Sequence, residues 1–291
     1  MKMAIAPGGA TLGDRLEMRS ILTAALAAAS LSIPSASFGA VSEGGIGDLL
    51  VAPTRLVLDG RKGAEVVLSN IGNEPATYRI SVEFRRMTEE GGLEDVEAPN
   101  DRDKIAQDMI VYAPRRVTLA PKVPQSIRIT ARPGPNIPDG EYRVHMLFRA
   151  IPPATPVTAA AADQKGLSFA LIPVYGVTIP VIVRLGYLQV KAGIKDVHLE
   201  SKDGKPTIAL DLSRTGDRST YGEVRVLKAG VKDPIAIQRG VAVNTEVEKR
   251  RVSIPMNAAF TGDPRGPVTI QYVETFNDGS HTLAEQQAVL R

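Results

Sequence analysis

The sequence predicts an all-β protein built from two immunoglobulin-like β-sandwich domains. Short runs rich in Val, Ile, Thr and Tyr recur along the chain and are separated by Gly, Pro, Asn and Asp, which is typical of strands joined by turns. One run, Thr77–Phe84, alternates apolar and polar residues with the period of two expected of a half-buried strand. The runs return about every 8–12 residues, which favours a sandwich over alternating strands and helices.

The composition limits the possible classes of protein. The 291 residues are 43% hydrophobic and 23% charged, which is ordinary for a globular protein and excludes a disordered, collagen-like or polytopic membrane chain. The absence of cysteine excludes a disulfide scaffold, thiolate metal sites and thiol catalysis. The net charge of +3 is small and the basic residues are scattered, so we expect no nucleic-acid partner.

Residues 1–40 are expected to be an N-terminal extension and signal peptide. An arginine precedes the short apolar run Ile21–Ala29, Pro34 follows, and small residues continue to Ala40, which is the layout of a secretory signal. Met18 is an alternative start. A membrane anchor is the other interpretation, but Pro34 interrupts a segment already too short to span a bilayer, so we expect no stable membrane insertion.

Residues 41–186 are expected to form the first sandwich. The acidic stretch Glu89–Asn100 is interpreted as a solvated loop, Pro152–Lys165 as a mobile linker, and no segment has the pattern of an amphipathic helix. The expected strands of this domain are, in order, Leu49–Leu58, Ala64–Ser69, Thr77–Phe84, Met109–Tyr112, Arg116–Leu119, Gln125–Ala131, Glu141–Ala150 and the apolar run Leu167–Leu185.

Residues 187–291 are expected to form the second sandwich, after a hinge at Gly186. The Asp-Gly pairs at 203–204 and 278–279 predict tight turns between strands. The expected strands of this domain are Leu188–Lys191, Lys195–Glu200, Thr207–Leu212, Gly222–Leu227, Arg251–Ile254, Val268–Thr275 and Thr282–Leu290.

The sequence offers no motif for catalysis. The three histidines, His145, His198 and His281, are too far apart to form a metal-binding pair, so we expect no metal and no cofactor. His145 lies within an alternating strand, where a structural role is favoured. No nucleophile elbow, phosphate loop or dinucleotide motif is present, so the expectation is a protein that is not an enzyme. A β-sandwich glycosidase with two carboxylates far apart in the sequence is the alternative enzyme.

Several motifs in order resemble a known family. The segments that carry the likeness are Pro53–Val57 with Val66–Asn70, Ile110–Pro114, Leu119–Pro121 with Gln125–Ile129, Pro138–Arg143 running to Ile151-Pro152-Pro153, and Val181–Arg184. Together they are similar to the PapD-like periplasmic chaperones of the chaperone–usher pathway. Thr178–Val181 is similar to a Ser/Thr-x-Pro-Val pattern of the archaic-type branch, so the chain resembles a divergent member.

The resemblance implies a fold and a function. It implies two immunoglobulin-like domains set in an L, and a periplasmic location. It further implies a chaperone that binds pilus or fimbrial subunits by donor-strand complementation and delivers them to an outer-membrane usher. The implied partners are therefore a pilin-like subunit and the usher. The alternative is a structural or adhesive surface protein of immunoglobulin-like domains without a client.

The resemblance also implies a donor strand. Leu167, Phe169 and Leu171 form an apolar row at every second position, with Tyr175 on the same parity, and such a row suits strand addition to a subunit. The intervening residues up to Val174 would then face the core of the chaperone. The alternative is a strand buried on both faces. An exposed apolar edge strand favours aggregation, so a self-capping dimer is an expected resting state.

Three further residues gain roles from the resemblance. Arg55 matches the arginine that binds the carboxylate at the C-terminus of the subunit, a task that suits a planar guanidinium. The lysine that usually accompanies it is replaced by Pro180. Glu141 and Arg184 match positions that orient the two domains, and the sequence leaves Glu274 and Asp278 open as their acidic partner from the second domain.

Overall fold

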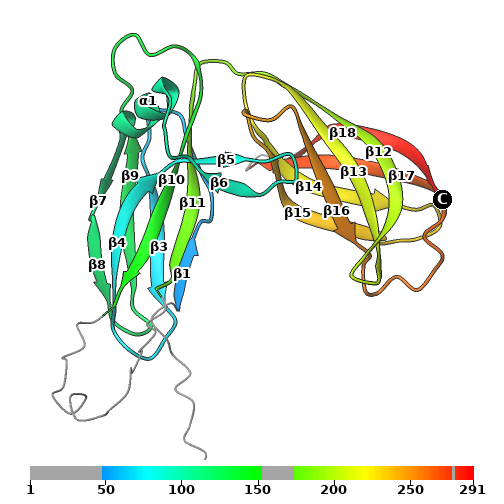
Figure 1. Ribbon diagram of the computed structural model, residues 1–291, viewed down its shortest axis with the longest axis horizontal. Coiled ribbons are helices and arrows are strands. Elements are labelled where there is room, and N and C mark those ends of the chain that lie inside the picture. The colour runs from blue at the N-terminus through cyan, green and yellow to red at the C-terminus, as the bar shows by residue number, and fades with distance from the viewer. Residues whose placement is uncertain (1–47, 153–173, 277–278) are drawn as a thin grey trace, which may run out of the picture. The chain divides into compact units, whose positions relative to one another are not determined.

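The computed structural model describes residues 48–152, 174–276 and 279–291, all of which belong to one compact unit. These residues form two all-β sandwiches, each with its own hydrophobic core, as the sequence predicts (Figure 1). The signal peptide, the linker and the proposed donor residues Leu167, Phe169 and Leu171 lie outside the described residues. Within the described ranges, no helix has the length and apolar character that crossing a membrane requires.

The first sandwich pairs a four-stranded sheet with a five-stranded sheet. The four-stranded sheet has the order β1 (Leu49–Ala52), β3 (Ala64–Asn70), β9 (Pro124–Ala131) and β7 (Ile110–Ala113). The five-stranded sheet has the order β2 (Leu56–Leu58), β11 (Gly176–Leu185), β10 (Gly140–Ile151), β4 (Ala76–Glu83) and β8 (Arg116–Leu119). Every pair is antiparallel except β2 with β11, which run parallel.

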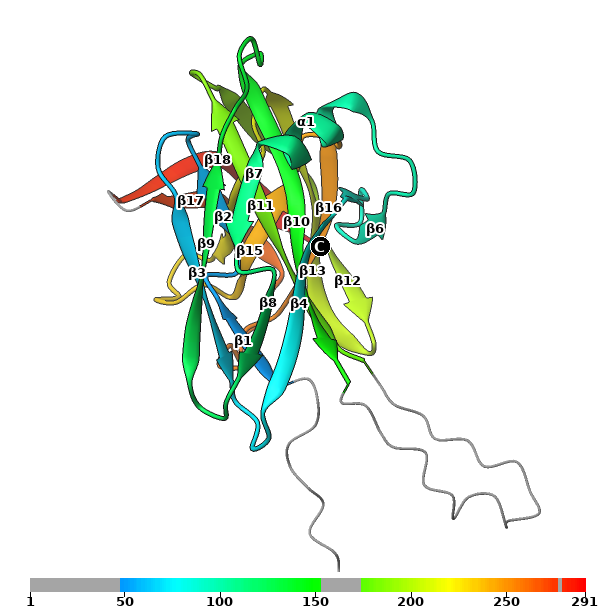
Figure 2. The ribbon, with the colours of Figure 1, turned by 90° about the vertical axis from the view of Figure 1, so that its left-hand side faces the viewer.

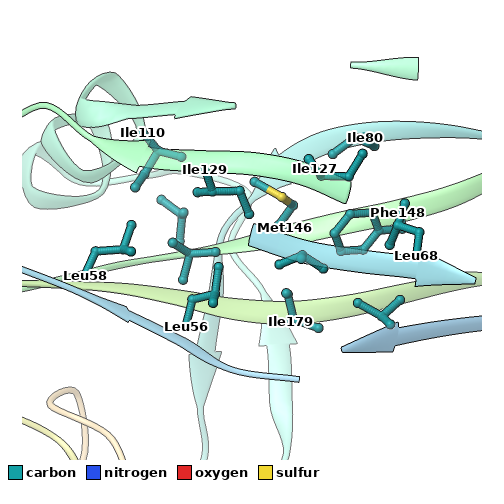
Figure 3. Packing of buried hydrophobic residues seen from close by; sticks show 14 of the residues in the cluster. Leu56, Leu58, Leu68, Ile80, Ile110, Ile127, Ile129, Met146, Phe148 and Ile179 are labelled. Carbon is teal, nitrogen blue, oxygen red and sulfur yellow. The ribbon is translucent and has the colours of Figure 1, made fainter. Parts of the chain in front are cut away.

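The core of the first sandwich follows from the two-residue period of its strands. On β10, every second residue from Tyr142 to Ala150 is buried and points into the core. Aliphatic side chains from both sheets meet these residues, with Met146 and Phe148 at the centre (Figure 3). Burial of large aliphatic and aromatic side chains contributes about 1.5–3 kcal/mol each. This domain therefore needs no disulfide to hold its two sheets together.

The first expected strand is divided in two. The sequence predicts one strand over Leu49–Leu58. In the structure β1 ends at Ala52 and pairs with β3, whereas β2 begins at Leu56 and pairs with β11 in the other sheet. Pro53 lies in the break and has no N–H to donate to a sheet. The chain thus changes sheets at this proline, which brings β2 beside β11.

Two elements before β7 were not expected, a helix directly after the predicted loop Glu89–Asn100 and a hairpin whose second strand lies inside that loop. A helix, α1, spans Asp101–Met109, and Asn100 caps it through a capping box with Asp103. A short hairpin, β5 (Arg85–Met87) and β6 (Leu93–Asp95), leaves the end of β4 (Figure 1). Ala106 and Met109 are buried against the first core, so packing stabilises this polar helix.

The second sandwich pairs sheets of three and four strands. The smaller sheet has the order β12 (Val190–Lys202), β13 (Lys205–Gly216) and β16 (Lys249–Pro255). The larger has the order β15 (Ala236–Val243), β14 (Thr220–Leu227), β17 (Gly266–Phe276) and β18 (Gly279–Leu290). Asp203 and Gly204 both have positive φ in the turn between β12 and β13, as the Asp-Gly pair predicts.

Two expectations for this domain need correction. The two short strands expected over Leu188–Lys191 and Lys195–Glu200 are one strand, β12, whose register with β13 shifts between Lys195 and His198. The bulge interrupts the alternation that a single strand would show. Strand β15 is not among the expected strands, because Gly240 has a positive φ and the exposed Arg239 and Gly240 interrupt its apolar pattern.

Candidate functional site

The outer edge of β11 is only partly covered. Along its whole length, from Gly176 to Leu185, β11 pairs with β10 on one side. On the other side β2 covers only Val181–Val183. Among the described residues, no strand lies beside the outer edge of residues 176–180. This segment is therefore an open sheet edge that a further strand could extend.

The direction of the backbone groups on this edge follows from the pairing register. The N–H of Ala150 donates to the carbonyl of Tyr175, so this pair is hydrogen-bonded and the pairs alternate from there. Gly176, Thr178 and Pro180 then stand at positions whose backbone groups face away from β10. Pro180 has no N–H. Because it stands at an outward-facing position, no hydrogen bond to β10 is lost. The open edge has two outward N–H donors, at Gly176 and Thr178. Pro180, the next outward position, has none.

Arg55 directly precedes β2, the strand that covers part of the outer edge of β11. Leu56 is paired with Val181 in the parallel register, which places Arg55 next to Pro180 in that register. Its guanidinium lies 4.5 Å from the centre of the Tyr221 ring, and its Nη2 donates to Ser219 Oγ at 3.4 Å. Within the described chain Arg55 forms no ion pair. Burial, and then the charge of Arg184, lower the pKa of Arg55 from 12.5 to about 10, so it remains a cation at neutral pH.

A buried carboxylate joins the two sandwiches next to Arg55. Glu141 Oε2 accepts from Arg184 Nε at 3.0 Å, from the backbone N–H of Ser219 at 3.0 Å and from the Ser219 hydroxyl at 2.9 Å. Arg184 Nη2 in turn donates to the carbonyl of Ser219 at 2.9 Å. Glu141 and Arg184 come from the first sandwich and Ser219 from the segment that enters β14. The two residues assigned an orienting role from the sequence thus contact each other and the second sandwich.

The partner from the second sandwich is a serine. Glu274, one of the two acidic candidates, pairs instead with Arg218 at 2.9 Å, and Asp278 lies outside the described residues. The Ser219 hydroxyl donates to Glu141 and accepts from Arg55 and Arg184, which uses the full capacity of a hydroxyl group. No motif in the sequence distinguishes Ser219, because its role depends on residues brought together only by the fold.

The β5–β6 hairpin forms a second junction between the sandwiches. Glu246, between β15 and β16, accepts from the N–H of Met87 at 2.7 Å and pairs with Arg143 at 2.5 Å. At the tip of the hairpin, the carbonyl of Glu89 accepts from the N–H of Arg251 at 2.6 Å. Gly91 lies so close to the Arg250 guanidinium that an added Cβ would be 2.2 Å from its Nε. These contacts hold the hairpin against β16, the edge strand of the smaller sheet.

His145 lies on the same side of β10 as Arg143 and is buried. It faces Glu83 on β4 and Pro180 on β11. Burial, then the charges of Arg143 and Arg85, lower the pKa of His145 from 6.5 to about 3, so it is neutral in the folded protein. No group of three or more His, Asp or Glu among the described residues could hold a metal ion.

Of the two residues that follow the undescribed segment, Val174 departs from the expected parity. Val174, expected to face the core, is 40% exposed, and Tyr175 is 56% exposed. Tyr175 is expected to face outward and is exposed, and its carbonyl accepts from the N–H of Ala150, so the pairing with β10 continues one residue beyond Gly176.

Comparison with known proteins gives similarity at the level of structure. No family model and no curated protein matches the sequence. The YadV chaperone aligns at 12% identity and a TM-score of 0.43, over 84% of this chain and all of that chain. The SafB chaperone bound to the Salmonella enterica SafA pilin aligns at 17% identity and a TM-score of 0.40, over 84% of this chain and 97% of that chain.

A third similar structure comes from the archaic chaperone–usher Csu pili of Acinetobacter baumannii. The pre-assembly complex of the chaperone CsuC with the tip adhesion subunit CsuE aligns at 13% identity and a TM-score of 0.38, over 70% of this chain and 89% of that chain. All three proteins are chaperones, the class that the sequence motifs resemble, and two of the three structures contain a pilin or a tip subunit.

Proposed function

We propose that this protein is a non-enzymatic periplasmic chaperone that binds a pilus subunit by strand addition along the outer edge of β11 and passes it to an outer-membrane usher. The observation that carries this proposal is the open edge of residues 176–180, which ends beside the unpaired cation Arg55. An open edge supplies backbone hydrogen bonds to an incoming strand. The cation supplies a fixed end point for that strand.

The relative position of edge and cation favours one direction of binding. Strand β11 runs from Gly176 toward Arg184, and Arg55 stands next to Pro180. The C-terminus of a client strand that runs parallel to β11 along the open edge would therefore lie at Arg55. Its terminal carboxylate would then meet the guanidinium. A strand antiparallel to β11 would bring an ammonium group there, which the charge of Arg55 disfavours. The proposed client therefore offers a C-terminal strand.

The surroundings of Arg55 support a role in anion binding. Its guanidinium is partly buried against Tyr221, and a desolvated cation binds a carboxylate more tightly than a solvated one does. The neighbouring cation Arg184 is already neutralised by Glu141. Because Arg55 and Arg184 share this one carboxylate, one positive charge is in excess at this point, and Arg55 takes over alone a task that PapD-like chaperones share with a lysine.

Glu141 and Arg184 are proposed to orient the site. Their bonds to Ser219 hold the segment that carries both Ser219 and Tyr221, and these two residues contact the Arg55 guanidinium. Leu167, Phe169 and Leu171 are proposed to extend the donor edge upstream of β11 and to fill pockets of the client. Their period of two matches the period of a strand.

The test uses the outward N–H of Thr178. Thr178→Pro removes that donor. The pairing with β10 is unaffected, because the N–H of residue 178, like the position of Pro180, faces away from β10. Thr178→Val is the matched control, because both variants lose the hydroxyl bond to Glu83 and only the proline loses the N–H. Each variant is coexpressed with a pilin-type subunit, and the soluble 1:1 complex is measured by size-exclusion chromatography with mass determination.

We expect the Val variant to retain the complex and the Pro variant to lose most of it. Circular dichroism and a thermal melt establish that both free variants are folded. A folded Pro variant that retains the subunit as well as the Val variant does would mean that the edge of β11 does not bind the subunit strand. In that case the proposed function loses its supporting observation.

A further inference from the structure

A row of three arginines crosses the exposed face of the five-stranded sheet. Arg79 on β4 is paired in register with Arg116 on β8 and with Arg149 on β10. The three strands lie side by side in the sheet (Figure 2). Directly paired residues of antiparallel strands point to the same face and have Cβ atoms about 4.5–5.5 Å apart. All three arginines are exposed, so three positively charged side chains project from the same face of the sheet in a row.

The row has no counter-charge in the described chain. No ion pair, hydrogen bond or ring contact engages the side chains of these three residues there. The other sheet of the same sandwich is different, because Arg128 on β9 pairs with Glu65 on β3 at 3.3 Å. Like charges placed directly opposite each other in a sheet are destabilising. Folding therefore does not account for the row.

An apolar groove adjoins the row. Its volume is about 480 Å³, and it is lined by Arg79 and Arg149 together with the aliphatic side chains of Leu147, Ile151 and Val174. Of these, Val174 is 40% exposed. The surface thus combines a line of positive charge with an apolar floor.

From this combination we infer that the arginine row, defined as Arg79, Arg116 and Arg149, binds an acidic polypeptide segment of a partner protein. Carboxylates complement the row, since a guanidinium grips a carboxylate through two parallel hydrogen bonds. Aliphatic side chains next to the carboxylates fill the groove. Among the described residues that line the groove there is no aromatic ring on which a base could stack, so a nucleic acid fits less well.

The charge also argues against the segment between Pro152 and Val174 as the occupant. The segment between Pro152 and Val174 contains a single acidic residue, Asp163, and Lys165 is nearby, so it cannot neutralise three arginines. The row lies on the face of the sheet, whereas the open edge of β11 lies at its side. The inference therefore goes beyond the proposed function and stands independently of it.

The experiment measures the binding of a fluorescein-labelled peptide of alternating Asp and Leu to the full chain by anisotropy. The matched probe is the same peptide with Asn for Asp. The test variant is Arg79→Gln/Arg116→Gln/Arg149→Gln. The control variant is Arg128→Gln/Arg239→Gln/Arg265→Gln, which makes the same change in net charge at residues whose side chains are 82%, 79% and 70% exposed.

We expect the acidic peptide to bind the native chain and the Asn peptide not to bind. The test variant should raise the Kd at least tenfold, because three exposed charge pairs are lost, and the control variant should stay within about twofold. In low salt the Tm of the test variant should rise by roughly 2–4 °C, because the repulsion within the row is relieved.

Three results would overturn the inference. The first is equal weakening by the test and control variants, which would indicate net charge rather than the row. The second is a fall in the Tm of the test variant, which would mean that the arginines stabilise the fold. The third is stronger competition by inorganic polyphosphate than by unlabelled peptide at equal charge, since the occupant would then be a phosphate polymer.

Discussion

The Ser219 hydroxyl lies 2.9 Å from the Glu141 carboxylate, and both residues are buried although they belong to different sandwiches. The bond connects β10, at the centre of the first domain, with the start of β14 in the second. A buried carboxylate is costly unless donors surround it, and Arg184 and two groups of Ser219 meet this need. The two domains thus share one polar cluster, with Arg55 at its border.

Removing the charge of Glu141 is expected to destabilise the protein strongly. Glu141→Gln should lower the free energy of unfolding by about 3 kcal/mol, because Arg184 is left without its counter-charge in a buried site. Ser219→Ala should cost about 1–2 kcal/mol, and the double variant less than the sum, because both changes break the same bond. Urea unfolding measures all three. If the free-energy losses of the two single variants add up to that of the double variant, the two residues do not share one cluster.

Arg55 is expected to select for a free C-terminal carboxylate. Arg55→Ala should raise the Kd for a peptide of the last strand of the subunit by roughly tenfold to 100-fold, the loss typical of a charge-assisted bond. The amidated form of the peptide should bind both proteins alike within about twofold, and Arg61→Ala, at an exposed arginine, serves as the control. Isothermal titration calorimetry gives the constants. Equal weakening of the acid and the amide would show that Arg55 does not bind the carboxylate.

The hairpin tip is expected to tolerate no side chain at Gly91. Gly91→Ala places a Cβ against the Arg250 guanidinium at a position with φ of +83° and should cost about 1–2 kcal/mol. Gly92→Ala is the neighbouring control, since its added Cβ would meet only Thr88 Oγ1 at 3.4 Å. Limited proteolysis of the native protein should cleave the hairpin faster in the first variant than in the second. Identical cleavage would mean that the hairpin tip is not held by β16.

His145 is expected to make the protein less stable in acid. Its pKa is about 3 when folded and 6.5 when free, so between these values the unfolded chain takes up a proton that the folded chain refuses. Stability should therefore fall as the pH drops below about 6.5, by at most about 1.4 kcal/mol per pH unit from this group.

The matched variant is His145→Gln, which keeps a polar side chain but does not titrate. The carboxylates and arginines around His145 are the same in both proteins, so the difference between their urea midpoints isolates the histidine. This difference should change between pH 7.5 and pH 4.5 in favour of the variant. A constant difference across that range would show that His145 is protonated as easily in the folded state as in the unfolded state.

Local periodicity was sufficient to predict most of the strands. Arg116–Leu119 has the bounds expected from the sequence, and Thr77–Phe84 differs from β4 by one residue at each end. Both alternate because one side faces the core and the other water, which leaves a direct trace in the sequence. β11 was predicted only within a longer apolar run, because a strand with buried residues on both faces does not alternate between apolar and polar residues.

Features that depend on distant contacts could not be predicted. Helix α1 is polar and is held by the burial of Ala106 and Met109, although Asn100 and Asp103 did carry the signal of a capping box. Arg55, Glu141 and Arg184 were identified through the family resemblance alone. Their meeting point Ser219 lies between β13 and β14 and depends on how the two sandwiches pack, and the arginine row arises from strand register; no single segment encodes either.

Pro180 has a consequence for timing. It limits the exposed donor groups of β11 to two described amides, at Gly176 and Thr178, and each hydrogen bond to an incoming strand adds only about 1 kcal/mol. A strand that lacks one such bond dissociates faster than a strand that forms it. If the proposed function holds, one missing N–H thereby shortens the residence time of a client and favours its rapid transfer over long-term storage.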